Sequence, residues 1–366
     1  MMKKLIYIFA VFVLVAACTE SDDSNDNGVV DNYNRAAMQT NLADNIIIPS
    51  FQNLKASLEI LSDANSIFVA SPDQVNLDNL RTAWLEAYKK WQLVEPFDIG
   101  QAEVISYRFQ MNVFPTDVVN IESNIENGNY DLAHSNNNDA VGFPALDYML
   151  YGLADSDTEL LNKYQDVKYI TYLTDLIEAM QTLTDSVLTD WTTNYRSTFI
   201  SSTSNTDTSA TNMFINDFMI YFERILRSNK IGTPSGVFAS SVLPNNAEAI
   251  FNGESSRELA IIALNNIQNI FNGRAASTSP IGEGFYSYLV ELDRTDLATL
   301  INSRIDDARA KLEVLNVDIK TQVETDFLKV REAYDALQLV NISFKVDMFA
   351  AFQVRVDPLY NDNDGD

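Results

Sequence analysis

Two long stretches of this 366-residue chain contain neither proline nor glycine, and this constrains the fold more than any other feature. One covers residues 169–191 and the other residues 319–354. In the second, apolar residues recur at the spacing of one face of an α-helix. That stripe consists of Phe327, Val330, Tyr334, Leu337 and Phe344. Because strand-like alternation is hard to find elsewhere, the chain is predicted to be all-α.

Further helical stripes occur in the middle of the chain, and polar segments separate them. Residues 201–209 are rich in Ser, Thr, Asn and Asp, so we interpret them as a loop and as the boundary between two halves. The additional stripes are Phe214, Phe218, Phe222 and Ile225, and then Leu259, Ile262, Ile267 and Ile270.

The N-terminus has the pattern of a bacterial export signal. Lys3 and Lys4 precede an apolar run, residues 5–17, which is too short for a membrane span of about 20 residues. Small residues then lead to Cys18, and this resembles a lipobox, which implies cleavage before Cys18 and lipidation of its thiol and amino group. We therefore predict a signal peptide over residues 1–17. The alternative is an ordinary signal peptide with a chance cysteine.

Cys18 is the only cysteine, so disulfides within the chain and thiolate metal clusters are excluded. The polar residues after it predict a disordered tether over residues 18–32. An acidic run at this place resembles the surface-export signals of Bacteroidetes lipoproteins; the alternative is a spacer that faces the periplasm. Either way, we expect a cell-envelope protein that is lipid-anchored to the outer membrane.

The charge balance limits the classes of partner. The chain has 51 acidic and 25 basic residues, which gives a net charge of −26. Such a surface repels nucleic acid and anionic membranes, so neither is an expected partner and contact with the membrane is expected through the lipid anchor. The hydrophobic fraction of 46%, with 20 Phe and 16 Tyr, is ample for a packed core.

Residues 142–152 resemble the signature of the imelysin family, Gly-x-His-x-x-Glu followed by an aromatic and aliphatic run and a glycine. Gly142 is kept, but Pro144 stands at the histidine position and Asp147 at the glutamate position. Proline offers no donor atom to a metal. It is favoured in the first turn of a helix, where a carboxylate also meets the positive end of the dipole. We therefore favour a helix start over a metal site here.

Other blocks resemble the same family, in family order: residues 84–100, residues 112–117, and residues 230–236 with Glu248 downstream. The resemblance implies two helical bundles packed side by side, with the signature near the groove between them. On this basis we place an N-terminal bundle at residues 33–200 and a C-terminal bundle at residues 201–366. The resemblance also implies membership of a group discussed either as metallopeptidases or as iron-regulated uptake components.

Several residues of these blocks are candidates for a binding groove. A hard-cation site, for a divalent or iron cation, could be made from the carboxylate oxygens of Glu95, Asp98, Asp117, Asp147 and Glu248. The alternative, which we favour, is that the carboxylates cap helices or pair with cations such as Arg108 and Lys230. The candidate residues are Glu95, Asp117, Asp147, Tyr148 and Glu248.

No catalytic residue is assigned from the sequence. The single histidine, His134, lies in an Asn-rich segment and is interpreted as a surface loop residue. The sequence contains no Gly-x-Ser-x-Gly elbow and no phosphate-binding glycine loop. Without ligating histidines, peptidase activity and a histidine-based metal site are both disfavoured.

Three functional hypotheses follow. The first is an imelysin-like lipoprotein with a non-peptidase binding or accessory role in iron or metal acquisition. It would use the groove around Asp147 for a metal ion, a small ligand or another envelope protein. The second is a divergent metallopeptidase with a metal site made of oxygen ligands. The third is a structural or protein-interaction lipoprotein whose groove is filled by apolar side chains.

Overall fold

The structure, a computed structural model, describes residues 31–355. The predicted signal peptide and Cys18 lie outside the described residues, as does most of the tether. Within the described part no residue lies in a β-strand, so the prediction of an all-α fold is confirmed. None of the helices in this part combines the length and hydropathy that crossing a bilayer requires.

The described residues form helices joined by short loops; π-helical and 3₁₀ segments carry the label η. Those before residue 202 are α1 (Arg35–Asn41), η1 (Leu42–Ile47), α2 (Ile48–Ala70), α3 (Gln74–Trp91), α4 (Gln101–Val104), α5 (Tyr107–Met111), α6 (Val118–Asn127), η2 (Ser135–Asn137), α7 (Gly142–Asp147), η3 (Tyr148–Gly152), α8 (Asp157–Lys163), α9 (Val167–Asp190), η4 (Trp191–Tyr195) and α10 (Arg196–Ser201). Those after it are α11 (Ala210–Ile220), η5 (Tyr221–Gly232), η6 (Pro244–Asn246), α12 (Ser256–Phe271), α13 (Phe285–Glu291), α14 (Thr295–Glu313), α15 (Ile319–Ile342), η7 (Ser343–Met348) and α16 (Phe349–Phe352).

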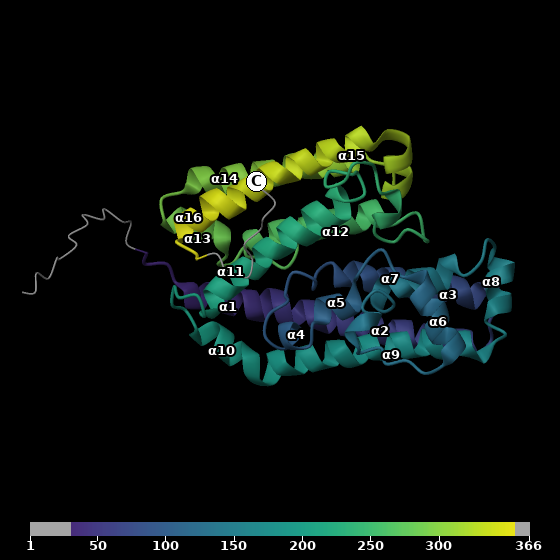
Figure 1. The fold of residues 1–366 in the computed structure, drawn as a ribbon. Helices are drawn as coiled ribbons and strands as arrows, with labels where there is room; N and C mark the ends of the chain where they lie inside the picture. Colours follow the sequence, from purple (N-terminus) through teal and green to yellow (C-terminus); the bar gives the residue numbers. More distant parts are fainter. Residues whose placement is uncertain (1–30, 356–366) are drawn as a thin grey trace, which may run out of the picture. The chain divides into compact units, whose positions relative to one another are not determined.

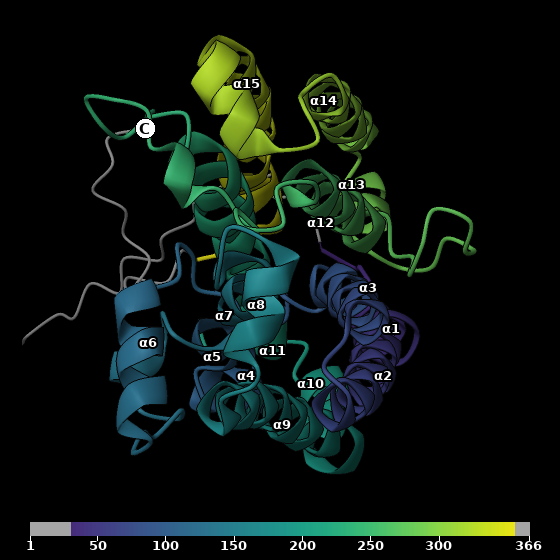
Figure 2. The same ribbon diagram turned by 90° about the vertical axis from the view of Figure 1, so that its right-hand side faces the viewer.

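Helices α1 to α10 lie together, and α12 to α16 lie together beside them, in both views of the ribbon (Figures 1 and 2). The buried apolar residues of both groups nevertheless belong to one cluster. The ring of Phe214 in α11 lies 5.9 Å from that of Phe199 in α10 and 6.2 Å from that of Phe97. Since the described residues from Asn32 onward form one compact unit, a division into bundles at residues 200 and 201 stays a prediction.

The helices form where apolar periodicity and polar caps coincide. Phe214, Phe218 and Phe222 of the predicted stripe are buried along α11 and η5. Ser209 begins α11, because its hydroxyl accepts a hydrogen bond from the Asn212 amide at 3.2 Å. Pro49 lies in the first turn of α2, directly after the π-helical segment η1, so the helical chain departs from α-helical geometry next to the proline.

Two π-helical segments position the candidate site. η3 continues α7 directly, and η5 continues α11 for twelve residues to Gly232. π-helical turns are rare in proteins, and those that occur are often found at functional sites. Here η5 carries Tyr221 and Lys230, and both side chains enter the buried cluster described below.

Candidate functional site

The signature segment forms α7 and η3, and its first residue must be glycine. Gly142 has φ +73°, and a Cβ there would lie 2.1 Å from the backbone oxygen of Met111. Pro144 lies in the first turn of the helix and is buried. The proline position therefore agrees with the interpretation as a helix start.

The sequence suggests that Asp147 lies at the start of its own helix and stabilises that end, but in the structure it has a different role. It is the last residue of α7, and only 2% of its surface is exposed. Its Oδ2 accepts a hydrogen bond from the amide of Phe251, and its Oδ1 accepts one from the amide of Asn252, each at 2.9 Å. The carboxylate thus caps a turn more than a hundred residues away and ties α7 to the segment before α12.

Burial raises the pKa of the Asp147 carboxyl to about 7. The two backbone hydrogen bonds lower the pKa and so oppose this effect, while the charges of Glu248 and Asp318 raise it further. A pKa near neutrality would suit a general acid or base. Both oxygens already hold backbone amides, however, so the carboxyl is placed to fix the turn rather than to meet a substrate.

Close to Asp147 lies a buried ion cluster, which consists of Glu95, Lys230 and Glu248. Lys230 Nζ lies 3.2 Å from Glu95 Oε2 and 2.5 Å from Glu248 Oε1. All three side chains are at most 2% exposed. The residue after Glu248, Ala249, has φ +54°, a left-handed conformation that non-glycine residues rarely adopt. Strained backbone of this kind persists where the surrounding contacts determine it, as they do at Glu248.

Neutral side chains complete the shell of this cluster. Asn112 Nδ2 donates to Glu95 Oε1 at 2.7 Å and lies 3.0 Å from Glu248 Oε1. Tyr88 donates its hydroxyl hydrogen toward Asn112 Oδ1 at 2.7 Å and Glu248 Oε1 at 3.0 Å. Gln92 Nε2 donates to Glu248 Oε1 at 3.2 Å. These contacts satisfy most of the buried polar atoms, as a buried charge network requires.

The electrostatics keep Lys230 charged. Burial alone lowers the pKa of a lysine, but the carboxylates of Glu248 and Glu95 outweigh it, so the pKa of Lys230 lies above its usual value. Burial raises the pKa of Tyr88, and the nearby carboxylates raise it further. Lys230 therefore stays an ammonium group and Tyr88 a neutral phenol at neutral pH, and neither serves as a base.

A second buried ion cluster lies beside the first. Arg108 Nη2 donates to the backbone oxygen of Glu95 at 2.9 Å and to Asp217 Oδ1 at 3.1 Å. Arg108 also lies 3.5 Å from Asp98. Burial raises the pKa of Asp217 to about 6, against the lowering effect of Arg108. Glu95 thus contacts both clusters, one through its carboxylate and one through its backbone.

The structure brings together some of the predicted site residues and separates others. Glu95 and Glu248 meet at Lys230, as the ion-pair interpretation expects, and Asp147 lies near them. Asp117 is exposed and caps α6 by accepting hydrogen bonds from the amides of Val119 at 2.8 Å and Asn120 at 3.1 Å. It takes no part in the cluster.

Tyr148 and His134 complete the set of residues that the sequence singled out. Tyr148 is buried, and its hydroxyl donates to Glu122 Oε1 at 2.6 Å. Its ring contacts that of Phe251 with centroids 5.3 Å apart, so it packs on the turn that Asp147 holds. His134 is exposed and begins a short 3₁₀ segment.

Sequence reasoning missed three polar members of the two clusters, namely Gln92, Asp217 and Tyr221. A signal for two of them exists in the helical spacing. Gln92 follows Tyr88 by four residues, and Tyr221 follows Asp217 by four, so each pair lies on one face. A polar residue within an aromatic stripe is the pattern that would have indicated them.

These residues do not fit a transition-metal site. Pro144 offers no ligand atom, and both oxygens of Asp147 accept backbone hydrogen bonds. The Lys230 ammonium already lies between Glu95 and Glu248, where it would repel a metal cation. In the described part, Glu248 Oε2 is the one carboxylate oxygen of this cluster without a partner. A single oxygen is far short of the roughly four ligands that a structural or catalytic zinc requires.

Comparison with known proteins gives a consistent family. The family model described as Imelysin matches residues 47–341. Among curated proteins, iron-regulated protein A of Synechococcus elongatus is 24% identical over 107 residues. That match covers 29% of this chain and 28% of the relative. The aligned part thus spans less than a third of that relative's length.

Two crystal structures share the fold. An imelysin-like protein from Psychrobacter arcticum is 19% identical, with a TM-score of 0.70 over 88% of this chain and 97% of its own. A protein described as a putative iron-regulated protein A precursor, from Parabacteroides distasonis, is 16% identical, with a TM-score of 0.71 over 87% of this chain and 95% of its own. At these identities the likeness supports the fold alone.

Proposed function

Because this chain belongs to the imelysin family, we propose that it is a cell-envelope lipoprotein with a non-peptidase, accessory role in iron acquisition. The observation that carries the proposal is the state of the signature segment. Pro144 replaces the histidine, and the Asp147 carboxylate holds the amides of Phe251 and Asn252. The segment joins two parts of the fold, and the use of both Asp147 oxygens for backbone amides supports a role other than metal-dependent peptide hydrolysis.

The iron role is supported by relatives whose names refer to iron regulation. We infer that iron, or the machinery that takes it up, is the context in which the protein works. The buried cluster around Lys230 is not the iron site in this proposal. The protein would act by contact with other envelope components.

The peptidase part is tested with purified protein and unstructured protein substrates, with and without added Zn²⁺ or Fe²⁺ and with a chelator. We expect no hydrolysis above the blank in any condition. Hydrolysis that the chelator abolishes, and that Asp147→Asn lowers while Asp117→Asn does not, would establish a divergent peptidase and overturn the proposal.

The iron part is tested in the source organism by deletion of the gene. We expect slower growth in iron-limited medium, normal growth in iron-replete medium, and recovery when the wild-type gene is returned. Equal growth of the deletion strain in both media would remove the iron role.

The lipid anchor is tested with Cys18→Ser. We expect the wild type in the membrane fraction with metabolically incorporated fatty acid, and the variant without the label. A wild-type protein that carries no fatty acid would show that the export signal is of the ordinary kind.

A further inference from the structure

Helix α9 is flanked by two hollows on the surface of the first group of helices. The larger, about 420 Å³, is lined by side chains of α2 and α9. The smaller, about 180 Å³, is lined by α9 and by residues of the segment that leads into α7. Thr182 lines both hollows, so they are adjacent across the exposed ridge of α9.

The smaller hollow is apolar. Gln110 and Thr182 are its polar lining residues. Its volume is below the roughly 300–1,000 Å³ of pockets that enclose drug-sized ligands. It is therefore suited to an aliphatic side chain of a larger partner, which would bury apolar surface there. Its main apolar lining residues are Leu132, Val141, Leu176, Ala179, Met180 and Leu183.

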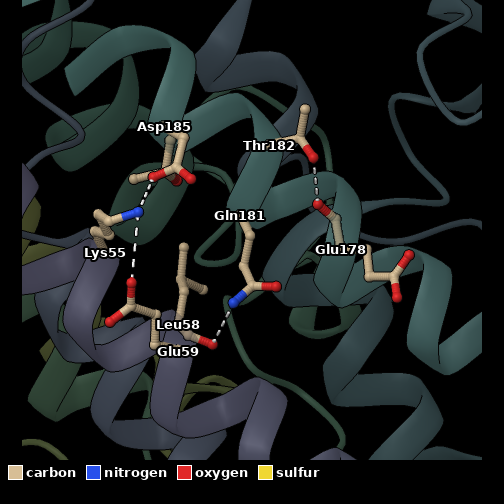
Figure 3. A pocket seen from close by; sticks show the side chains of 8 residues that line it. Lys55, Leu58, Glu59, Glu178, Gln181, Thr182 and Asp185 are labelled. Carbon is tan, nitrogen blue, oxygen red and sulfur yellow. Dashed lines mark hydrogen bonds and ion pairs between the residues drawn. The ribbon is translucent and has the colours of Figure 1, made fainter. Parts of the chain in front are cut away.

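The larger hollow is acidic. Glu59, Glu178 and Asp185 line it, against the single ammonium of Lys55 (Figure 3). Lys55 pairs with Asp185 and lies 3.4 Å from Glu59. Among the described residues the carboxylate of Glu178 has no hydrogen-bond or ion-pair partner, and Figure 3 shows it turned away from the Lys55 pair. An exposed carboxylate thus stands at the rim, on the residue that directly precedes Ala179 of the apolar hollow.

We propose that these two hollows together bind a basic segment of a partner protein. In this complex an aliphatic side chain enters the apolar hollow beside Ala179, and a lysine or arginine pairs with Glu178. The acidic hollow selects the sign of the partner's charge, because like charges across an interface cost binding energy. Anionic lipid and nucleic acid are disfavoured by the same carboxylates and by the net charge of −26.

This inference does not depend on the iron role. It rests on the side chains around α9, which share no residue with the buried clusters at Lys230 and Arg108. A protein without any role in iron acquisition could use the same surface, so the growth test above and the binding test below fail independently.

The test uses the purified protein and short fluorescent peptides as probes. One peptide contains lysine, leucine and serine; a second replaces leucine by serine, and a third replaces lysine by glutamate. Fluorescence anisotropy at low ionic strength gives the affinities. We expect the first peptide to bind at least about tenfold more tightly than the other two, because both the apolar and the charged contact are needed.

Two variants locate the binding. Glu178→Lys reverses the free charge and Ala179→Glu places a charge in the apolar hollow, and each should weaken binding of the first peptide at least about tenfold. The matched control is Glu324→Lys, an exposed residue on α15 with the same change of net charge, which should weaken it less than about twofold. Thermal melts of all variants show whether each variant is still folded. Hydrogen exchange of the wild type should show that residues 174–186 become more protected when the first peptide binds.

Several results would overturn the proposal. One is no binding of the first peptide at millimolar concentration. Another is an equal loss in Glu178→Lys and Glu324→Lys, which would show that net charge alone attracts the peptide. Equal binding of the leucine-free peptide would remove the apolar hollow from the interaction. Binding to anionic vesicles that Ala179→Glu reduces and Glu178→Lys strengthens would assign the surface to a membrane instead.

Discussion

Lys230 and Lys55 each pair with two carboxylates, but the two lysines differ in burial. Lys230 lies between Glu95 and Glu248 with 1% of its side chain exposed. Lys55 lies between Glu59 and Asp185 with 39% exposed. The arrangement of charges is the same, but one cluster is in the core and the other is in water.

The difference in burial indicates which of the two clusters stabilises the fold and which is available to a ligand. A buried ion pair loses its hydration, so removal of one partner leaves an uncompensated charge in the core. An exposed pair keeps most of its hydration, and its removal changes little. The Lys230 cluster is therefore part of the architecture, whereas the Lys55 cluster and its neighbour Glu178 are available to a ligand.

Lys230→Met should give the largest loss of stability. The substitution leaves Glu95 and Glu248 buried together without a cation, and we expect the free energy of unfolding to fall by about 3–5 kcal/mol. Chemical denaturation at neutral pH measures it. As a control, the triple variant with Glu95→Gln and Glu248→Gln also removes the two negative charges. It should recover part of the loss, and no recovery would mean that packing of the lysine stem, not charge, is what matters.

Asp147→Ala should rank second. It leaves the part-buried amides of Phe251 and Asn252 without their acceptor, and an amide that stays unsatisfied costs about 1–3 kcal/mol. We expect a loss of roughly 2–4 kcal/mol at mildly acidic pH. Asp117→Ala is the matched comparison, because Asp117 also accepts two backbone hydrogen bonds but is exposed. Its loss should be about 1 kcal/mol, as for an ordinary helix cap. Equal losses of stability in Asp147→Ala and Asp117→Ala would show that burial does not raise the cost of removing the carboxylate.

The pH dependence of the free energy of unfolding should also reveal the raised pKa of Asp147. Its pKa in the folded protein is about 7, above the ordinary value of 3.8 for an aspartate, so the folded state binds the proton more tightly than the unfolded state. The contribution of this group to stability is therefore fully present below the unfolded pKa and is lost as pH rises toward 7. From about pH 5.5 to about pH 8 we expect wild type to lose about 2 kcal/mol relative to Asp147→Asn. A constant difference between the two proteins over this range would contradict the raised pKa.

The sequence predicted the features that are local. The stripe through Phe214, Phe218 and Phe222 follows from a period of 3.6 residues, and these side chains are buried. Pro144 in a first helical turn, and His134 on the surface, follow from residue type and neighbours. The all-α fold is the sum of such local patterns.

The remaining features depend on segments far apart in the chain. Asp147 contacts amides 104 and 105 residues away, and no spacing rule links those positions. The same holds for Glu95 and Lys230, whose meeting requires α11 and η5 to pack on the residues that follow α3. The sequence marked the charged residues as candidates, but only packing determines which carboxylate meets which cation and which stays free at the surface.

Lys55→Met should have the smallest effect on stability, at most about 1 kcal/mol, because exposed pairs contribute little and are screened by salt. It should nevertheless change the surface. Without the ammonium, Glu59 and Asp185 add to the charge of Glu178, so the lysine and leucine peptide should bind more tightly to this variant than to wild type at low ionic strength. The gain should disappear at about 1 M salt, where the screening length is about 3 Å. Weaker binding to the variant would mean that Lys55 itself contacts the peptide, and the acidic hollow would then have to be assigned to a partner with a carboxylate.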